Sequence, residues 1–218
     1  MKRLLTAAAG AALMLAAAPA TAQVTNGGFE DPGATGGTIA GIGAFTTVAP
    51  FWNIYNNANA TTTATLVAST APGGGANMFH IVTNGGADGL YQFPAGLYGF
   101  LQADFYVLSG VAQLISAYNG ATVDGGAAFV TTTALGRWQR LTVNYAGGAN
   151  EPVLYSFAAG ADFYVDNVVT GAYRQGEAET SLTNLSGTPE PGAWALMILG
   201  FGGVGAVLRR QRTAAVAA

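Results

Sequence analysis

The stretch QRLTVNY at residues 139–145 alternates apolar and polar side chains. In an extended chain Leu141, Val143 and Tyr145 point to one side, and the polar residues between them point to the other. This period of two is typical of a strand with one buried face. Similar runs separated by Gly-rich turns recur through the middle of the chain, where no stretch has a helical period. The pattern therefore predicts an all-β domain of two packed antiparallel sheets.

Residues 1–22 have the three parts of a secretion signal. Two basic residues, Lys2 and Arg3, are followed by an uncharged apolar run and then by the small-x-small site Ala20-x-Ala22. This order is characteristic of a signal peptide that is removed during export. We therefore expect cleavage after Ala22 and an exported mature chain.

The charge and cysteine content of the mature chain exclude several classes of function. Between residues 23 and 188 the chain carries three arginines and ten carboxylates, a net charge of about −7. Such a surface repels phosphate backbones, so we expect no nucleic-acid partner. The chain has no cysteine, which excludes thiol catalysis, zinc-thiolate sites and disulfides.

Residues 189–212 carry the most specific motif of the sequence. A Pro-Glu-Pro triplet precedes a tryptophan, an uncharged run from residue 192 to 208 and an arginine cluster. As a helix the run is about 25 Å long, at the short end of what spans a bilayer. The basic cluster predicts a C-terminus in the cytoplasm and a domain outside. The motif residues are Pro189, Glu190, Pro191, Trp194, Arg209, Arg210 and Arg212.

This tail resembles the PEP-CTERM sorting signal, in the variant with Trp-Ala after the motif. The resemblance implies that an exosortase recognises Pro-Glu-Pro, and that the host is a Gram-negative bacterium with an exopolysaccharide system. We expect the protein in the cell envelope, at the cell surface or in the extracellular matrix. A plain C-terminal membrane anchor is the alternative, and it also attaches the protein to the envelope. The polar residues 174–188 are predicted to form a flexible linker.

Two short motifs at the ends of the predicted domain, residues 23–173, resemble calcium-containing jelly-roll carbohydrate-binding modules. They are NGGFE at 26–30, with Phe51-Trp52 downstream, and FYVDNV at 163–168, preceded by Trp138-Gln139. The resemblance implies a jelly-roll, galactose-binding-like β-sandwich with a structural Ca²⁺ ion. Its ligands would be Glu30, Asp166 and the carbonyl of Gly28, and hard oxygen ligands suit this ion.

Two features of the sequence leave the calcium site open. Both carboxylates have an alternative interpretation as solvated or turn-capping groups. The sequence also departs from the usual pattern of the family, because Asp166 is followed by Asn167 and not by a second aspartate.

Carbohydrate binding requires aromatic faces that stack on sugar rings and polar groups that bond the hydroxyls. The same residue types are common in the core and at the edges of a sandwich, so the candidates form a shortlist. Its members are Trp52, Tyr55, Tyr91, Gln92, Tyr118 and Trp138, with Asn53, Asn56 and Gln113 as further polar partners.

The sequence gives little support for catalysis. His80 is the only histidine, and its strand-like surroundings indicate a hydrogen-bonded structural residue. No nucleophile elbow or zinc-protease motif is present, although Asp162 and Asp166 share a strand face and leave glycoside hydrolysis open. We therefore predict a non-enzymatic protein that binds polysaccharide. The alternatives are a self-assembling matrix protein without a sugar ligand and, with less support, a glycoside-active enzyme.

Overall fold

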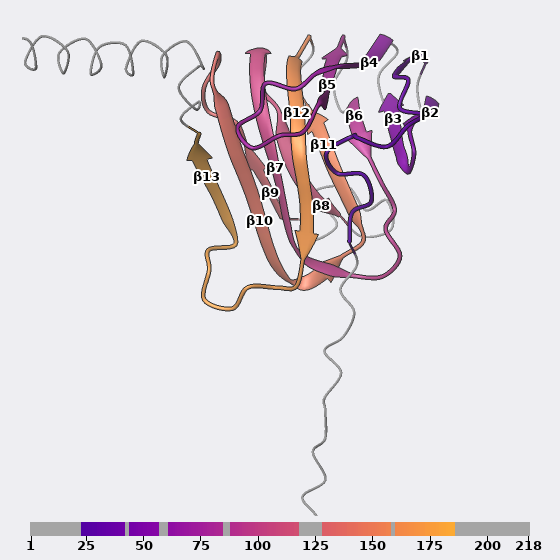
Figure 1. Ribbon diagram of the computed structural model, residues 1–218. Coiled ribbons are helices and arrows are strands. Elements are labelled where there is room, and N and C mark those ends of the chain that lie inside the picture. Colours follow the sequence, from indigo (N-terminus) through magenta and orange to yellow (C-terminus); the bar gives the residue numbers. More distant parts are fainter. Residues whose placement is uncertain are drawn as a thin grey trace, which may run out of the picture.

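The computed structural model describes residues 23–41, 44–56, 61–84, 88–117, 128–157 and 160–185. Within these ranges thirteen strands form two antiparallel sheets, packed face to face (Figure 1). The described ranges contain no helix. The predicted all-β sandwich is therefore confirmed. The predicted signal peptide and the sorting motif, with its apolar run, lie outside the described residues.

The larger sheet, sheet A, holds seven strands. In spatial order they are β1 (Gly37–Ala40), β4 (Thr61–Ala68), β5 (Asn77–Thr83), β12 (Asp162–Gly171), β7 (Tyr98–Ser109), β10 (Trp138–Ala149) and β13 (Thr180–Asn184).

The smaller sheet, sheet B, holds six strands. In spatial order they are β2 (Ala44–Ala49), β3 (Trp52–Asn56), β6 (Asp88–Tyr91), β11 (Glu151–Ser156), β8 (Gln113–Ala117) and β9 (Ala128–Thr131). Strands that follow one another in sequence often lie in different sheets, so the chain crosses repeatedly from one layer to the other, as in a jelly roll.

Strand β10 contains the stretch that predicted the fold, and its alternation is observed. Leu141 and Val143 are fully buried, whereas Arg140 and Thr142 between them are only half-buried. The Gly147–Gly148 pair, predicted as a turn, lies instead within this strand. A register shift against β7 between Asn144 and Ala149 accommodates the two glycines, as a β-bulge does.

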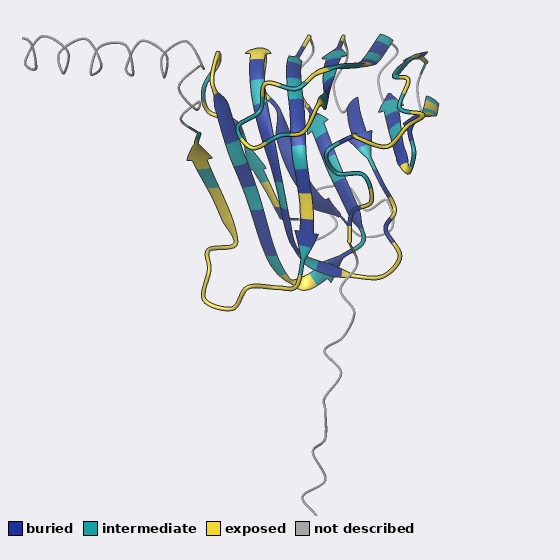
Figure 2. Ribbon diagram, viewed as in Figure 1, coloured by how far each residue is buried: buried dark blue, intermediate teal, exposed yellow. Residues whose placement is uncertain are grey.

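The strands of both sheets carry many buried residues (Figure 2), and their large apolar side chains form the core between the layers. Phe29 lies in the loop before the first strand, yet it is fully buried. Its ring contacts Trp52 and Phe79, with centroid distances of 5.5 and 4.8 Å. The N-terminal segment is thus held to the sandwich by aromatic packing, which explains why a loop residue belongs to the core.

The prediction of a flexible linker over residues 174–188 is wrong for residues 180–184. These residues form β13, which pairs with β10 at the edge of sheet A. Leu182 packs against the core, and Asn184 Oδ1 accepts a 2.8 Å hydrogen bond from Gln139 Nε2. The polar composition of this segment suggested a linker. Its backbone nevertheless pairs with β10, whose edge would otherwise leave N–H and C=O groups without partners.

Candidate functional site

Sheet B presents aromatic side chains on its outer face. On β3, Trp52 and Ile54 point into the core, so Tyr55 between Ile54 and Asn56 points outward. On β11, Leu154 is buried and Tyr155 is half-buried on the other side. Together these tyrosines place aromatic side chains on the outer surface of the sheet, although β8 between β11 and β9 is buried on both faces.

Strand pairing aligns these side chains in two rows. The first row runs through Phe45, Tyr55, Gly89, Tyr155, Gln113 and Thr131. The second runs through Thr47, Asn53, Tyr91, Val153, Ile115 and Phe129. We call the two rows, with the adjoining Phe93 and Phe157, the aromatic face.

The rings of the aromatic face contact one another in pairs and remain accessible. Tyr91 lies edge-on to Tyr55 and to Phe93, with centroid distances of 6.2 and 5.3 Å. Tyr155 lies edge-on to Phe157 at 5.1 Å. Phe45, Phe93, Phe129 and Phe157 are between 45 and 67% exposed. Such accessible rings, fixed by their neighbours, suit stacking on a flat apolar ligand surface.

Gly89 separates the two tyrosines of the first row. Tyr55 and Tyr155 both pair with this residue from the flanking strands. A Cβ atom at Gly89 would overlap with the carbonyl oxygen of Leu154, so the close approach of β6 and β11 requires glycine. Gly89 therefore places no side chain between the two tyrosines in this row.

Polar groups lie among the rings. Asn53 Oδ1 accepts a hydrogen bond from Thr47 at 2.9 Å, and Gln113 donates to Thr131 at 2.9 Å. Glu151 of β11 and Asp88 of β6 are acids whose charges act on these tyrosines. Burial raises the pKa of the Tyr91 hydroxyl, and the negative charge of Glu151 raises it further. Burial likewise raises the pKa of Tyr155. The tyrosines are therefore neutral donors at physiological pH.

The structure separates the shortlisted ligand residues. Tyr55 and Tyr91 lie together on the aromatic face with Asn53 and Gln113. Trp52, Gln92 and Asn56 are buried and drop out of the candidate ligand surface. Trp52 Nε1 donates to the carbonyl of Asn26, and Gln92 bonds both backbone groups of Thr25. Trp138 lies on the outer face of the opposite sheet, and Tyr118 lies outside the described residues.

Sequence reasoning missed Tyr155 and the four exposed phenylalanines. A signal was present, because Tyr155 and Phe157 alternate with Leu154 and Ser156 just as Tyr55 alternates with Ile54. No feature of the sequence predicted that β11 pairs with β6, which brings Tyr155 opposite Gly89.

The two predicted calcium ligands lie close together on the outside of sheet A. Glu30 accepts hydrogen bonds from the backbone and side chain of Asn77 at 2.8 and 3.2 Å. Asp166 accepts one from Ser69 Oγ at 2.6 Å. Gly74 and Gly75 form the wall between them, because a Cβ at Gly74 would overlap with Asp166 Oδ2 and one at Gly75 with Glu30 Oε1.

The N-terminal segment reaches this place along β12. The Gly27 carbonyl accepts a 2.9 Å hydrogen bond from the backbone of Val168, and the Val24 backbone donates to Thr170. A Cβ at Gly28 would lie 3.7 Å from Glu30 Cγ. Gly28 is thus next to the Glu30 side chain, and the role of its carbonyl remains a prediction.

Burial and the neighbouring negative charges around Asp166 would favour a bound cation. The carboxylate is fully buried. Burial, together with the negative charges of Asp104 and Glu30, raises its pKa to about 6, although bonds from Ser69 and the Asn167 backbone oppose the shift. Two carboxylates and a hydroxyl are donors that suit calcium. No group of three or more acidic, histidine or cysteine side chains suited to a metal is found in the described ranges.

Asn167 lies between the carboxylates of Asp104 and Asp166, so an aspartate there would add a third negative charge that repels both. Its backbone is left-handed, with φ of 53°, where β12 shifts register against β7, and asparagine tolerates this conformation. Its Nδ2 donates to Asp104 Oδ2 at 2.9 Å. Asp104 is also bonded by Arg140 at 2.7 and 2.8 Å. The departure from the usual Asp-Asp pattern thus adds a donor between two buried acids.

His80 and the two aspartates of β12 take part in hydrogen bonds. His80 Nε2 and Asp162 Oδ1 are 2.6 Å apart, so the predicted hydrogen-bonded histidine is confirmed. Asp162 and Asp166 do lie on one face of β12, but Asp162 contacts His80 and Asp166 contacts Ser69.

The predicted secretion and sorting residues lie outside the described ranges. This applies to Ala20 and Ala22, to the Pro-Glu-Pro motif and to the three arginines that follow it. Among the residues that are described, no helix has the length and apolar character needed to cross a bilayer.

Comparison with known proteins finds no matching family model. It also finds no match among curated proteins. Among solved structures, the chain is similar to a family 11 carbohydrate-binding module from Clostridium thermocellum, in complex with a β-1,3-1,4-mixed-linked tetrasaccharide. The identity is 13% and the TM-score 0.39, over 57% of this chain and 91% of that one.

A second similar structure contains the CBM22-1 and GH10 modules of Clostridium thermocellum endo-1,4-β-D-xylanase 10B, complexed with xylohexaose. The identity is 13% and the TM-score 0.38, over 58% of this chain. The match covers only 26% of the xylanase chain. At this level of similarity neither ligand is transferred to the present chain.

Proposed function

We propose that the protein binds a neutral polysaccharide through the aromatic face of sheet B. The observation that carries the proposal is the alignment of Tyr55, Gly89 and Tyr155 in one row beside Tyr91 in the next. Stacking rings and neutral hydroxyl donors are what a sugar chain requires, since each pyranose has an apolar face and a polar rim.

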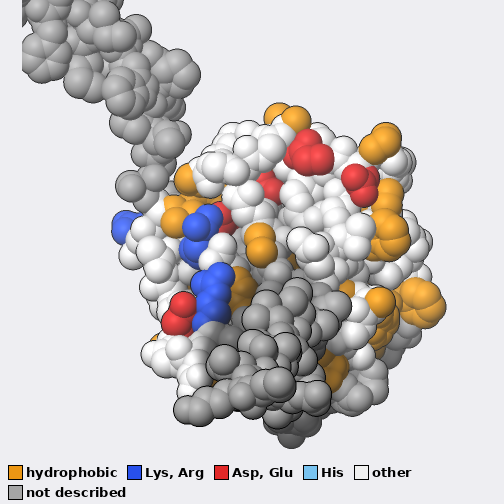
Figure 3. All heavy atoms as spheres, turned by 60° about the horizontal axis from the view of Figure 1, so that its bottom comes forward, with side chains coloured by type: hydrophobic (Ala, Val, Ile, Leu, Met, Phe, Trp, Pro, Cys, Tyr) orange, Lys and Arg blue, Asp and Glu red, His pale blue; other side chains and the backbone are white. Residues whose placement is uncertain are grey.

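The charge of the molecule favours a neutral ligand. The described residues include three arginines and nine carboxylates. Arg140 is bonded to Asp104, and Arg174 contacts the Phe100 ring, both on sheet A. On one side of the molecule the arginines gather at one border and hydrophobic side chains at the other (Figure 3). An acidic polymer would meet the negative charge of Glu151 near Tyr91, which disfavours its binding.

The proposed activity is binding without turnover. General acid–base cleavage of a glycoside uses two carboxyl groups on either side of the scissile bond. Glu151 and Asp88 both act on the tyrosines of the aromatic face, but Asp88 is fully buried, where it accepts a hydrogen bond from Thr62. The function is therefore adhesion to polysaccharide.

Affinity electrophoresis of the full chain in gels that contain glucan, xylan or an acidic polysaccharide tests this proposal. We expect retardation by a neutral polymer, and an association constant about two- to tenfold lower in Tyr91→Ala and in Tyr155→Ala. Tyr173→Ala is the matched control, because this tyrosine is 44% exposed but lies after β12. Equal retardation of all these variants would remove the aromatic face as the binding site.

Self-assembly without a sugar ligand is the second candidate function. The exposed phenylalanines of the aromatic face favour it, since clustered apolar surface often marks a protein interface. Sedimentation of the wild-type chain and of Phe45→Ser/Phe129→Ser separates the two functions. Oligomers that dissociate in this variant, without retardation by any polysaccharide, would favour the matrix protein.

We further propose export and exosortase processing at Pro189-Glu190-Pro191. The support is the order of the motif, the uncharged run and the arginine cluster in the sequence. In a host with an exosortase, Glu190→Ala should leave an uncleaved form in the membrane. Normal maturation of this variant would contradict the proposal.

We also propose a structural Ca²⁺ ion held by Glu30 and Asp166. Their proximity and the raised pKa of Asp166 support it. When bound, the ion would compensate the two negative charges and link the N-terminal segment to β12. The protein residues bring the carboxylates together through the hydrogen bonds of Asn77 and Ser69.

A further inference from the structure

The outer face of sheet A carries a second alignment of ring side chains, far from the aromatic face. Strand pairing places His80 of β5 opposite Tyr164 of β12, Tyr164 opposite Tyr106 of β7, and Tyr106 opposite Trp138 of β10. Residues that flank them, such as Phe79 and Phe105, are fully buried in the core, so the four rings project outward. We call His80, Tyr164, Tyr106 and Trp138 the sheet A row.

The rings of the sheet A row support one another across the strands. His80 stacks on Tyr164 at 4.4 Å with 21° between the planes. Tyr106 contacts Tyr164 and Trp138 at 6.2 and 5.6 Å. The tyrosines are half-buried and the indole is 7% exposed. At about 4.8 Å per strand the row extends roughly 14 Å, enough to contact more than one sugar unit.

The polar atoms at the tips of these rings have no protein partner within the described part of the chain. Trp138 Nε1 and the hydroxyls of Tyr106 and Tyr164 make no hydrogen bond there, and none of these atoms is buried. Asp162 bonds His80 through Oδ1 alone, and its side chain is 31% exposed. The row thus combines ring surface with open donors and an open carboxylate oxygen, the two requirements of a sugar site.

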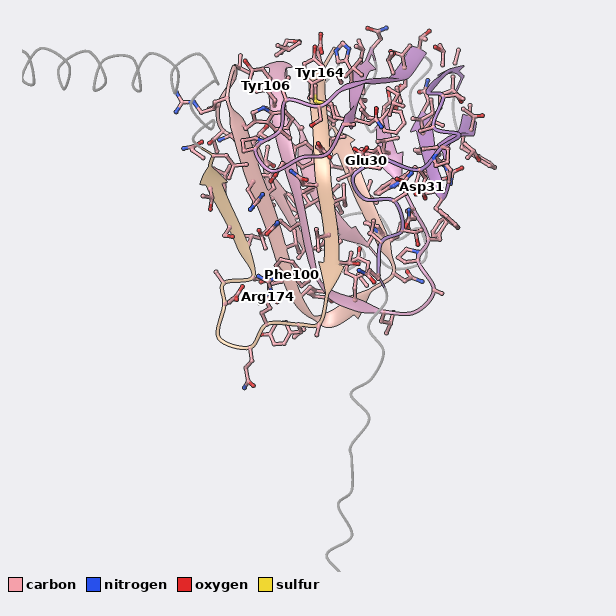
Figure 4. All side chains as sticks on the ribbon, viewed as in Figure 1. Glu30, Asp31, Phe100, Tyr106, Tyr164 and Arg174 are labelled. Carbon is pink, nitrogen blue, oxygen red and sulfur yellow. The ribbon has the colours of Figure 1, made fainter. Side chains whose placement is uncertain are left out.

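The chain covers other outward groups of sheet A and most of Trp138, but leaves His80, Tyr106 and Tyr164 partly exposed. Tyr106 and Tyr164 lie at one end of their strands, and Phe100 lies at the opposite end (Figure 4). There the Arg174 guanidinium stands 3.3 Å above the Phe100 ring, which is only 2% exposed. The loop between β4 and β5 reaches Asn167 through the Pro72 carbonyl and Asp166 through Ser69. Among the described residues, no comparable contact lies over His80, Tyr106 or Tyr164.

We infer that the sheet A row is a second binding site for a neutral glycan chain. The rings contact the sugar faces, Asp162 Oδ2 accepts from a sugar hydroxyl, and the tyrosine and indole groups bond the remaining oxygens. Because the two sites are on opposite sheets, one domain holds two polysaccharide chains. Bridging of two chains rests on the proposed function of the aromatic face. Binding at the sheet A row does not depend on it.

Two double variants of the full chain separate the sites. The face variant is Tyr91→Ala/Tyr155→Ala, and the row variant is Tyr106→Ala/Tyr164→Ala. The neutral polysaccharide that most retards the wild type in affinity electrophoresis serves as the probe. Adding the row substitutions to the face variant should lower its residual association constant at least about fivefold. Tyr106→Phe/Tyr164→Phe keeps the rings and the fold, and should lose about twofold through the missing hydroxyls.

Bridging is measured with beads coated with the same polysaccharide. Wild-type protein that sediments as a monomer should aggregate the beads, whereas the face and row variants should bind them singly. A row variant that is retarded and aggregates beads like the wild type overturns the second site and leaves the aromatic face intact. If the face variant loses retention completely and the row variant loses none, the second site is likewise overturned and the aromatic face is kept. Retention lost only in the row variant contradicts the proposed function and keeps the row.

The charge class of the ligand is tested with Arg137, an exposed residue next to Trp138. If the glycan is neutral, adding Arg137→Ala to the face variant should not change its retention, either at low or at high salt. A loss of retention that depends on salt would overturn the neutral ligand at the row. If no polysaccharide retards the wild-type chain, both sites are refuted.

Discussion

The Asp166 carboxylate and the Ser69 hydroxyl are 2.6 Å apart, although 97 residues separate them in the sequence. This contact joins the loop between β4 and β5 to β12. Glu30, in the N-terminal segment, accepts a hydrogen bond from Asn77, the first residue of β5, where this loop ends. Three segments that are distant in sequence therefore depend on two neighbouring carboxylates.

The first prediction concerns pH. The pKa of Asp166 is raised to about 6 by burial and by neighbouring acids, so the folded state holds this proton more tightly than the unfolded chain. In the absence of calcium, the contribution of Asp166 should lower the free energy of unfolding by up to roughly 3 kcal/mol as the pH rises from about 4 to above 6. Asp166→Asn lacks this loss, so its stability relative to wild type should increase over that range. Urea unfolding at pH 4 and pH 7 measures the difference, and a constant difference would contradict the prediction.

The second prediction concerns calcium. An ion that binds only the folded state at a hundredfold excess over Kd stabilises it by about 2.7 kcal/mol, which raises the Tm of a domain of this size by several degrees. Glu30→Gln and Asp166→Asn should each remove most of the shift, whereas Asp31→Asn, an exposed neighbour, should keep it. Thermal unfolding in calcium and in chelator gives the answer. Superimposable wild-type curves in the two buffers would exclude the ion.

The third prediction concerns Gln92, which bonds the backbone N–H and the carbonyl of Thr25 at 2.8 and 2.9 Å. Gln92→Ala leaves two polar groups without partners and should lower the free energy of unfolding by roughly 2–4 kcal/mol. Gln102→Ala is the control, because Gln102 is half-buried on the outer face of sheet A and should cost less than about 1 kcal/mol. Similar losses in the two variants, measured by urea unfolding, would show that the clamp on Thr25 does not stabilise the fold.

The fourth prediction concerns Gly89. A methyl group there would overlap with the Leu154 carbonyl, so Gly89→Ala should separate β6 from β11 and destabilise the protein by about 1–3 kcal/mol or more. At Gly171 an added Cβ would meet only Phe100 Cδ1, at 3.8 Å. Gly171→Ala should therefore be close to neutral. The same stability for both variants would refute the close-approach requirement at Gly89.

The sequence was sufficient for the fold class because alternation is a local property. Apolar side chains recur at every second position of residues 139–145, and β10 buries Leu141 and Val143 of this apolar set. The burial of Trp52 and Gln92 was not predictable in the same way, because their partners, Asn26 and Thr25, lie 26 and 67 residues away. Likewise, only strand pairing brings Tyr55, Gly89 and Tyr155 into one row. Long-range register has no local signal in residue type.

The place of β13 has a mechanical consequence. Residues 180–184 are the last described strand and pair only with β10, at the edge of sheet A. A pulling force applied beyond Asn184 therefore loads this short ladder first, before any strand of the central core. If β13 detaches and the hydrogen bonds between Asn144 and residues 174–179 also break, the eight residues 172–179 can extend to at most about 29 Å. The other strands of both sheets would keep their pairing while this segment extends, so a C-terminal load would spend its first displacement outside the core.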